Sequence, residues 1–255
     1  MKKYADRYMV FIQAGTICVL LLIWQAAAWL GKINPVVASS PEDIVRELWG
    51  WIADGSILVN LLSTLRILFL GYALGVVGGL ALGVLKGLSP TARAYLDPFF
   101  TFANSFPRIL LIPFFVVWLG FGVTPKVIVV FLVLVFMVIA IVENGVREIG
   151  DDIIAGTRVL GAGPVGLLMD VYLPGIGLWI LVSARVCVGY ALQAAVVSEF
   201  FGANHGLGFL IMKGEGSYDI AAIYAALLVT VILALVFQSL LGLLERRFVR
   251  WLPAG

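Results

Sequence analysis

The chain has 255 residues, of which 62% are hydrophobic and 13% are charged, and its mean hydropathy is +1.08. Soluble domains are about 45–50% apolar, so a water-soluble fold of this size could not bury so much apolar surface. The apolar residues form long blocks without the alternation of a half-buried strand. The composition therefore predicts an all-α integral membrane protein in contact with lipid. The formal net charge of +2 gives no reason to expect a nucleic-acid partner.

Six segments are long and apolar enough to cross a bilayer, whose core of about 30 Å needs roughly 20 helical residues. Three of the apolar runs, 8–31, 67–85 and 220–244, contain no charged residue. A single transmembrane domain, 1–255, is predicted. Its spans are expected near residues 9–30, 62–86, 95–120, 126–143, 170–200 and 220–244.

Basic residues near the ends of the spans predict the orientation, because they are enriched on the cytoplasmic side. With a cytoplasmic N-terminus, the inside segments hold Lys2, Lys3, Arg7, Lys86, Arg93, Arg147, Arg158, Arg246, Arg247 and Arg250. The outside segments then hold only Lys32, Arg46, Lys126 and Lys213. Both termini are therefore expected to be cytoplasmic.

The outer segment after the first span begins a helix at Ser40-Pro41, since serine caps a helix and proline suits its first turn. Apolar residues then recur at helical spacing, and Trp49 and Trp51 are of the type that favours the membrane interface. A short helix lying on the outer surface is expected.

Glycines in the second span and prolines in the third predict how the backbone packs and bends. Glycines recur every four residues in the second span, at Gly71, Gly75, Gly79, Gly83 and Gly87. Such a stripe predicts that a neighbouring helix packs closely, and a moving interface is the alternative. In the third span, Pro107 and Pro113 predict a break or a kink.

A polar segment, 144–168, separates the fourth and fifth spans and is far longer than two adjacent helices need. Small residues near its middle permit close approach of a partner's backbone. Val159 and Leu160 offer apolar contacts that a loop this small cannot bury by itself. The segment is therefore predicted to bind another protein.

This segment resembles the cytoplasmic docking loop of binding-protein-dependent ABC importer permeases. The family pattern reads Glu-Ala-Ala, three residues, Gly, nine residues, Ile, one residue, Leu-Pro. Placing its glycine on Gly161 aligns 155–157 with the triplet and 171–174 with the end, with Ala155 where the family has Glu and Val171 where it has Ile. The residues to which the resemblance assigns ATPase docking are Ala155, Gly156, Thr157, Arg158, Leu160, Gly161 and Ala162.

Two further blocks, 107–122 and 199–208, are similar to permeases of the nitrate, sulfonate, taurine and bicarbonate importers. The resemblance implies a type I importer bundle in the bacterial inner membrane. It also implies pairing of two permeases, one cytoplasmic ATPase docked on each, and an external solute-binding protein. ATP and Mg²⁺ would then belong to the ATPase, because this chain has no Gly-x4-Gly-Lys-[Ser/Thr] phosphate loop. The chain itself is not expected to be an enzyme.

Polar residues inside the spans are candidates for a translocation path. An arginine costs about 2.5–3.5 kcal/mol at the centre of a span, and Arg108 and Arg185 are predicted to attract a small oxyanion, sulfonate or organic acid. Asn104, Ser105 and Gln193 are neutral candidates for the same path. Snorkelling to headgroups remains open for Arg108, and hydrogen bonding between helices remains open for the neutral residues.

A secondary transporter or channel is the alternative function, and a membrane enzyme is the next. A secondary transporter usually needs an ionisable group near the midplane, and the spans hold no well-centred carboxylate, since Glu199 lies at a span end. A membrane enzyme would need a nucleophile with a base, or a set of metal ligands, and no group of His, Cys or acids has metal-ligand spacing. The identity of the ligand is not encoded in any motif.

Overall fold

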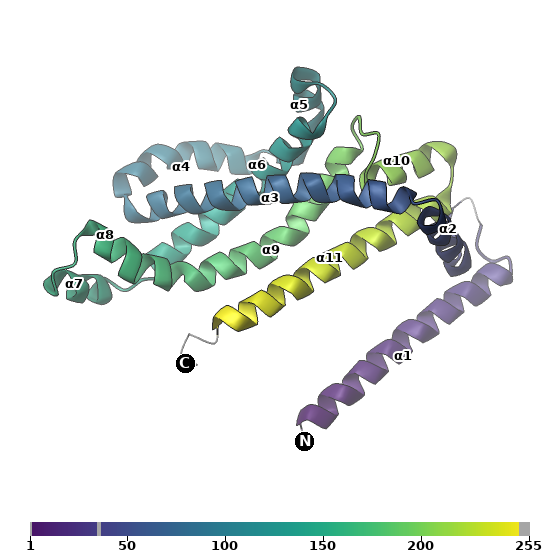
Figure 1. The fold of residues 1–255 in the computed structure, drawn as a ribbon, viewed down its shortest axis with the longest axis horizontal. Helices are drawn as coiled ribbons and strands as arrows, with labels where there is room; N and C mark the ends of the chain where they lie inside the picture. The colour runs from purple at the N-terminus through teal and green to yellow at the C-terminus, as the bar shows by residue number, and fades with distance from the viewer. Residues whose placement is uncertain (1, 35–36, 250–255) are drawn as a thin grey trace.

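The computed structural model describes residues 2–34 and 37–249, and every regular element in those ranges is a helix (Figure 1). The first helices are α1 (Lys2–Trp29), α2 (Pro41–Ala53), α3 (Ser56–Leu88), α4 (Pro90–Ser105), the 3-10 helix η1 (Arg108–Leu111) and α5 (Ile112–Leu119). The remaining ones are α6 (Val123–Arg147), α7 (Asp151–Val159), α8 (Pro164–Gly166), the π-helix η2 (Leu167–Tyr172), α9 (Leu173–Glu199), α10 (Leu207–Ser217) and α11 (Ile220–Val249).

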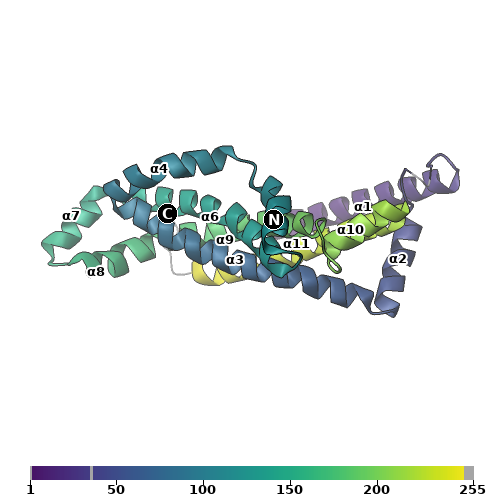
Figure 2. The same cartoon turned by 90° about the horizontal axis from the view of Figure 1, so that it is seen from above.

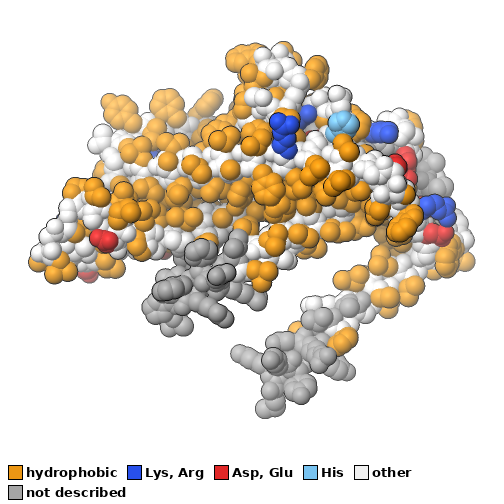
Figure 3. Space-filling view, in the orientation of Figure 1, with side chains coloured by type: hydrophobic (Ala, Val, Ile, Leu, Met, Phe, Trp, Pro, Cys, Tyr) orange, Lys and Arg blue, Asp and Glu red, His pale blue; other side chains and the backbone are white. Residues whose placement is uncertain are grey.

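Five helices are long and apolar enough to cross a membrane, and they lie in α1, α3, α6, α9 and α11. A sixth crossing is provided by α4 together with η1 and α5 if this bent pair counts as one span. The prediction of about six spans is thus confirmed. Hydrophobic side chains cover most of the face seen in Figure 3, as expected for a surface in contact with lipid.

Helices α3, α6, α9 and α11 run along the long axis of the molecule (Figure 1). Helices α7 and α8 lie at one end, here called the α7 end, and α2 lies at the other, here called the α2 end (Figures 1 and 2). Helix α1 stands apart from the bundle for most of its length. The start of α1 and the end of α11 both lie away from the α2 end (Figure 1).

The third span, expected over 95–120, is broken, as the two prolines predict. The chain is extended at Phe106 and Pro107, and the helices on either side of this break meet at 82°. A residue before proline is disfavoured in the α conformation, and proline lacks an N–H. Helix α4 therefore ends at Ser105, which leaves Arg108 at the start of η1.

The glycine stripe of α3 packs directly against α6, as predicted. A Cβ added at Gly71 would lie 2.5 Å from the Val130 Cβ, and one added at Gly79 would lie 2.5 Å from the Val138 Cβ. The α6 residues that fill the stripe from Gly71 to Gly87 are Val130, Leu134, Val138, Val142 and Val146. Because only glycine leaves room for these side chains, α3 and α6 form one tightly packed pair.

Helix α2 begins where the sequence predicts, with Ser40 as its N-cap accepting a hydrogen bond from the Asp43 N–H. One expectation about its surface is wrong. Trp51 is buried, together with Ile44, in the core that includes α11, whereas Trp49 is exposed. Trp51 is thus a packing residue and only Trp49 is free to meet a membrane interface.

The segment between the fourth and fifth spans is more ordered than the predicted loop 144–168. Helix α6 continues to Arg147, so the first four residues of that range belong to its last turn. Helix α7 has acids in its first turn and Arg158 in its last, the arrangement that the helix dipole favours. Short helix α8 and η2 then lead without a gap into α9.

Candidate functional site

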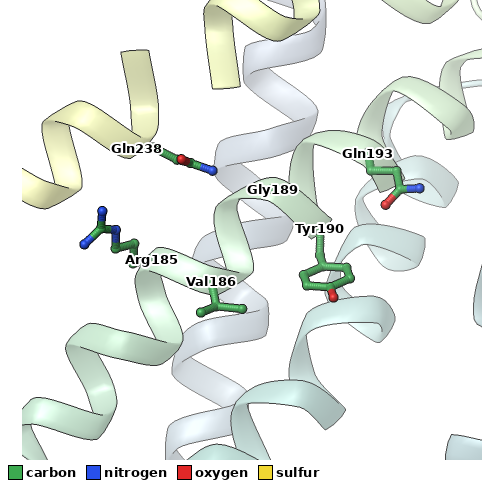
Figure 4. A pocket seen from close by; sticks show the side chains of 6 residues that line it. All are labelled: Arg185, Val186, Gly189, Tyr190, Gln193 and Gln238. Atoms are coloured by element: carbon green, nitrogen blue, oxygen red, sulfur yellow. The ribbon is translucent and has the colours of Figure 1, made fainter. Parts of the chain in front are cut away.

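One face of α9 is exposed although the helix lies inside the bundle, and this face is polar. Arg185, Gly189 and Gln193 are spaced four residues apart and therefore share it. Tyr190 lies beside them and is 48% exposed (Figure 4). The opposite face packs into the core, with Cys187, Ala191 and Ala195 all at 0% exposure.

Two open grooves meet on this face. The larger, of about 530 Å³, is lined by Arg185, Val186, Gly189, Tyr190 and Gln193 of α9 and by Gln238 of α11. The smaller, of about 260 Å³, is lined by Asn104, Phe106, Pro107, Arg108, Ile109, Val133, Tyr190, Gln193 and Ala194. Tyr190 and Gln193 line both grooves. A polar lane therefore crosses α9 from Arg185 to Arg108.

The break in the third span holds Arg108 in place. Its Nη2 donates to the Asn104 side-chain oxygen, and its Nε donates to the Ala103 carbonyl at 3.3 Å. The guanidinium carbon lies 4.7 Å from the centre of the Phe136 ring, a distance that allows a cation–π interaction. The guanidinium is thus fixed beside the smaller groove.

Four of the five residues predicted to line a path lie in this lane, namely Arg108, Arg185, Asn104 and Gln193. Ser105 does not line either groove, and its hydroxyl donates to the Thr101 carbonyl at 2.9 Å, within α4. Tyr190 and Gln238 were missed. Tyr190 could have been found from the sequence because it lies next to the helix face shared by Arg185 and Gln193. Gln238 could have been found because it is a lone amide in an apolar span.

A buried hydrogen-bond network ties α10 to α3 and α9 near the α2 end. Glu199 is fully buried, and its carboxylate accepts from the Thr64 hydroxyl and the Gly208 N–H, both at 2.9 Å. The Thr64 hydroxyl accepts from the Leu207 N–H at 2.9 Å, and the Asn60 amide oxygen accepts from the Gly206 N–H at 2.8 Å. Three successive amides at the start of α10 are therefore each satisfied by a different side chain.

Lys126 is a buried cation that interacts with this carboxylate. The sequence counted it among the outside basic residues, at the start of the fourth span, and did not predict its burial. It lies in the first turn of α6 and is 5% exposed. Electrostatic attraction to Glu199 offsets part of the cost of its burial.

The predicted docking residues 155–162 lie at the α7 end, on and just after α7. Val159 and Leu160 are each 88% exposed. Gly161 has φ +90°, a left-handed conformation that favours glycine and ends the helix. Ala155 and Gly156 are also exposed, and a Cβ added at Gly156 would meet no other atom. The segment thus presents apolar side chains and open backbone at the tip of the molecule.

Comparison with known proteins identifies the family to which this arrangement belongs. Residues 75–250 match the model of the binding-protein-dependent transport system inner membrane component family. The chain belongs to this family. As a member, it is the multi-pass permease subunit of an ABC importer in the inner membrane, and an importer of this kind works with an ATPase and a solute-binding protein.

Relatives of this permease carry transport functions in their names. The taurine transport system permease protein TauC of Escherichia coli (strain K12) is 29% identical over 95% of this chain and 90% of its own length. The putative aliphatic sulfonates transport permease protein SsuC of Bacillus subtilis (strain 168) is 28% identical over 91% and 84%. An inward-facing structure of the MetNI methionine ABC transporter has a similar fold, with a TM-score of 0.63, 23% identity and coverage of 75% and 93%.

Proposed function

We propose that the permease carries a small anionic solute, of the sulfonate, oxyanion or organic-acid class, along the lane between Arg185 and Arg108. The observation that carries this proposal is the meeting of two grooves at Tyr190 and Gln193, with one arginine in each groove. The names of the taurine and aliphatic sulfonate relatives support the same class of solute.

Polar side chains exposed to lipid are energetically unfavourable, and this supports the proposal that a second copy of the permease covers the lane. An arginine facing lipid at the centre of a span costs about 2.5–3.5 kcal/mol, and the lane also holds Gln193, Gln238 and Asn104. Both grooves open on the surface of one chain, so a lane sealed from lipid requires another protein surface. A homodimer with the two lanes facing each other meets this requirement.

The α7 end is proposed to be cytoplasmic and to dock one ATPase per permease, two in the assembly. The exposed apolar pair Val159 and Leu160 and the open backbone at Gly156 support this role, because interface centres favour apolar anchors that desolvate on binding. ATP and Mg²⁺ are bound and ATP is hydrolysed on that partner, so this chain supplies the path and the contact. The external solute-binding protein delivers the solute at the α2 end.

The path is tested by replacing Arg108 and Arg185 separately with glutamine in the complete transporter, reconstituted in vesicles with its binding protein and ATPase. The solute probes are radiolabelled taurine and a panel of small alkanesulfonates and carboxylates. Loss of one charge-assisted contact of about 1.5–3 kcal/mol should reduce uptake roughly tenfold or more in either variant. Assembly and binding-protein capture should be unchanged.

Arg66→Gln is the matched control, since Arg66 is an exposed arginine of α3 that lines neither groove. Its uptake should equal that of the wild-type protein. Wild-type uptake by both Arg108→Gln and Arg185→Gln would overturn the proposed path.

A further inference from the structure

Helix α4 is held to the bundle without burying any of its own residues. None of its 16 residues is fully buried, and Tyr95, Phe99 and Phe102 are each more than 70% exposed. Apolar packing of the kind that joins α3 to α6 is therefore missing here. Figure 2 shows α4 as an outer arm beside the bundle.

A cluster of ion pairs supplies the attachment near the α7 end. Lys86, in the last turn of α3, lies with its Nζ 2.7 Å from the Asp97 carboxylate of α4 and 2.8 Å from the Glu143 carboxylate of α6. The Arg93 Nε of α4 lies 3.1 Å from the other oxygen of Glu143. The same Lys86 Nζ lies 4.6 Å from the centre of the Phe100 ring. One lysine thus joins three helices.

The burial of these groups makes Lys86 the centre of the cluster. Its side chain is 6% exposed, against 12% for Glu143 and 49% for Asp97. A buried charge is stabilised only while its partners stay in place. Movement of either carboxylate away from Lys86 is therefore unfavourable, and the three helices are held in one arrangement.

The position of the cluster links two parts of the protein that the proposed function needs. Glu143 lies one turn before the end of α6 at Arg147. From there the chain leads into α7 and the predicted docking residues 155–162, here called the docking segment. Asp97 lies on α4, whose far end leads through the break to Arg108. Between them, Gly83 and Gly87 pack α3 onto Val142 and Val146, so α3 and α6 move together at this level.

We propose that Lys86 is a positioning residue that couples the docking segment to the solute lane, by joining Asp97 of α4 to Glu143 of α6. A displacement of the end of α6, driven by the ATPase, is passed through Lys86 to α4 and so to Arg108. This inference rests on the proposed function. It concerns the amount of solute transported for each ATP hydrolysed. Docking of the ATPase and binding of the solute do not by themselves determine that ratio.

The aromatic contacts of α4 beside the cluster leave a separate role for the ion pairs. Phe100 packs edge-on against Phe136 at 5.3 Å between ring centres, and Arg108 lies over the same Phe136 ring. These contacts set the distance of α4 from α6 but offer little resistance to sliding. The ion pairs fix the position of α4 along its axis, because their geometry is directional.

The test uses the complete transporter in vesicles and compares Asp97→Asn with the wild type. Asp97 is half exposed, and the Lys86–Glu143 pair remains after this change, so the fold should persist. We expect solute transported per ATP hydrolysed to fall about five- to tenfold, in the range of typical coupling between sites. ATP hydrolysis and binding of the ATPase should remain near wild-type values. Asp97→Glu, which keeps the charge, should restore much of the ratio.

A second measurement reports on α4 directly. Spin labels at Val77 of α3 and Tyr95 of α4, both exposed, are introduced after replacement of Cys18 and Cys187. The distance distribution should be narrow with Asp97 and clearly broader in Asp97→Asn. Glu215→Gln, an exposed acid of α10 outside the cluster, is the matched control for the spin labels and should leave the distance distribution as narrow as in the wild type.

An unchanged ratio of transport to hydrolysis in Asp97→Asn would overturn the inference, as would an unchanged distance distribution. A parallel fall of transport and hydrolysis would also overturn it, because that result indicates a purely structural cluster. If the wild-type permease failed to bind any ATPase, the proposed function would fall, and the spin labels would still decide whether Lys86 and Asp97 hold α4.

Discussion

Glu199 is the buried acid at the end of α9, and its environment explains how a carboxylate is accommodated there. Two donors, the Thr64 hydroxyl and the Gly208 N–H, point at its oxygens, and Lys126 supplies an opposite charge. The same network satisfies the first amides of α10, which otherwise have no helical partner. The acid therefore fixes the start of α10 against α3.

Replacing Glu199 by alanine should destabilise the permease, because the Gly208 N–H loses its acceptor and the Thr64 hydroxyl keeps only the Asn60 carbonyl. Each buried group left unpaired costs about 1–3 kcal/mol. Thermal unfolding of the purified protein in detergent should begin at a clearly lower temperature. Glu199→Gln keeps one acceptor oxygen and should lose less. Equal loss in both variants would show that the hydrogen bonds are not what the acid contributes.

Single residues were the hardest level to predict from sequence. Arg108, Arg185, Asn104 and Gln193 could be chosen because each is a polar group within a span. Ser105 met the same criterion, but its hydroxyl is satisfied by the carbonyl one turn earlier. The burial of Glu199 and Lys126 could not be foreseen, since both lie at span ends and their electrostatic interaction joins positions far apart in the chain.

At the level of elements, the contact between α3 and α6 is set by backbone proximity. Four-residue spacing places the glycines on one stripe, and valine and leucine side chains of α6 fill the space above it. This is the reason that α3 and α6 act as one body, to which α4 is joined through the ion pairs of Asp97 and Arg93.

The glycine stripe predicts different effects for two adjacent alanine substitutions. A Cβ at Gly79 would lie 2.5 Å from the Val138 Cβ, whereas a Cβ at Gly78 would be 3.4 Å from the Phe131 ring, an ordinary contact. Gly79→Ala should cost about 1–3 kcal/mol through overpacking, and Gly78→Ala should be neutral or slightly stabilising. Unfolding of the two variants in denaturing detergent measures the difference. Similar stability of the two would contradict close packing at the stripe.

Elements with strong local signals were predicted well. Ser40 and Pro41 predicted the start of α2. The glycine spacing predicted that a neighbouring helix packs closely on α3, and Pro107 predicted the break in the third span. Local signals did not reveal that α2 turns Trp51 inward, because that choice depends on contact with α11. They also did not reveal α7, since its nine residues are too few for a clear apolar period.

For the whole molecule, the tight α3–α6 pair connects two functional regions. The docking segment extends from the end of α6, and the solute lane crosses α9 beside it. Composition was sufficient to predict a membrane bundle of about six spans, and the spacing around Gly161 was sufficient to predict the family. The proposed closure of the lane by a second copy depends on another chain and follows from no motif in one sequence.

In the proposed function, the exposed tip at Leu160 binds the ATPase that powers import. The most direct test measures the affinity of the detergent-purified permease for its cognate ATPase, comparing Leu160→Ser with Val45→Ser, an exposed apolar residue of α2 at the opposite end. Loss of a central apolar anchor costs about 2 kcal/mol or more. Leu160→Ser should weaken binding at least roughly tenfold, while Val45→Ser should bind like the wild type. Wild-type affinity in Leu160→Ser would show that the ATPase does not dock on this tip.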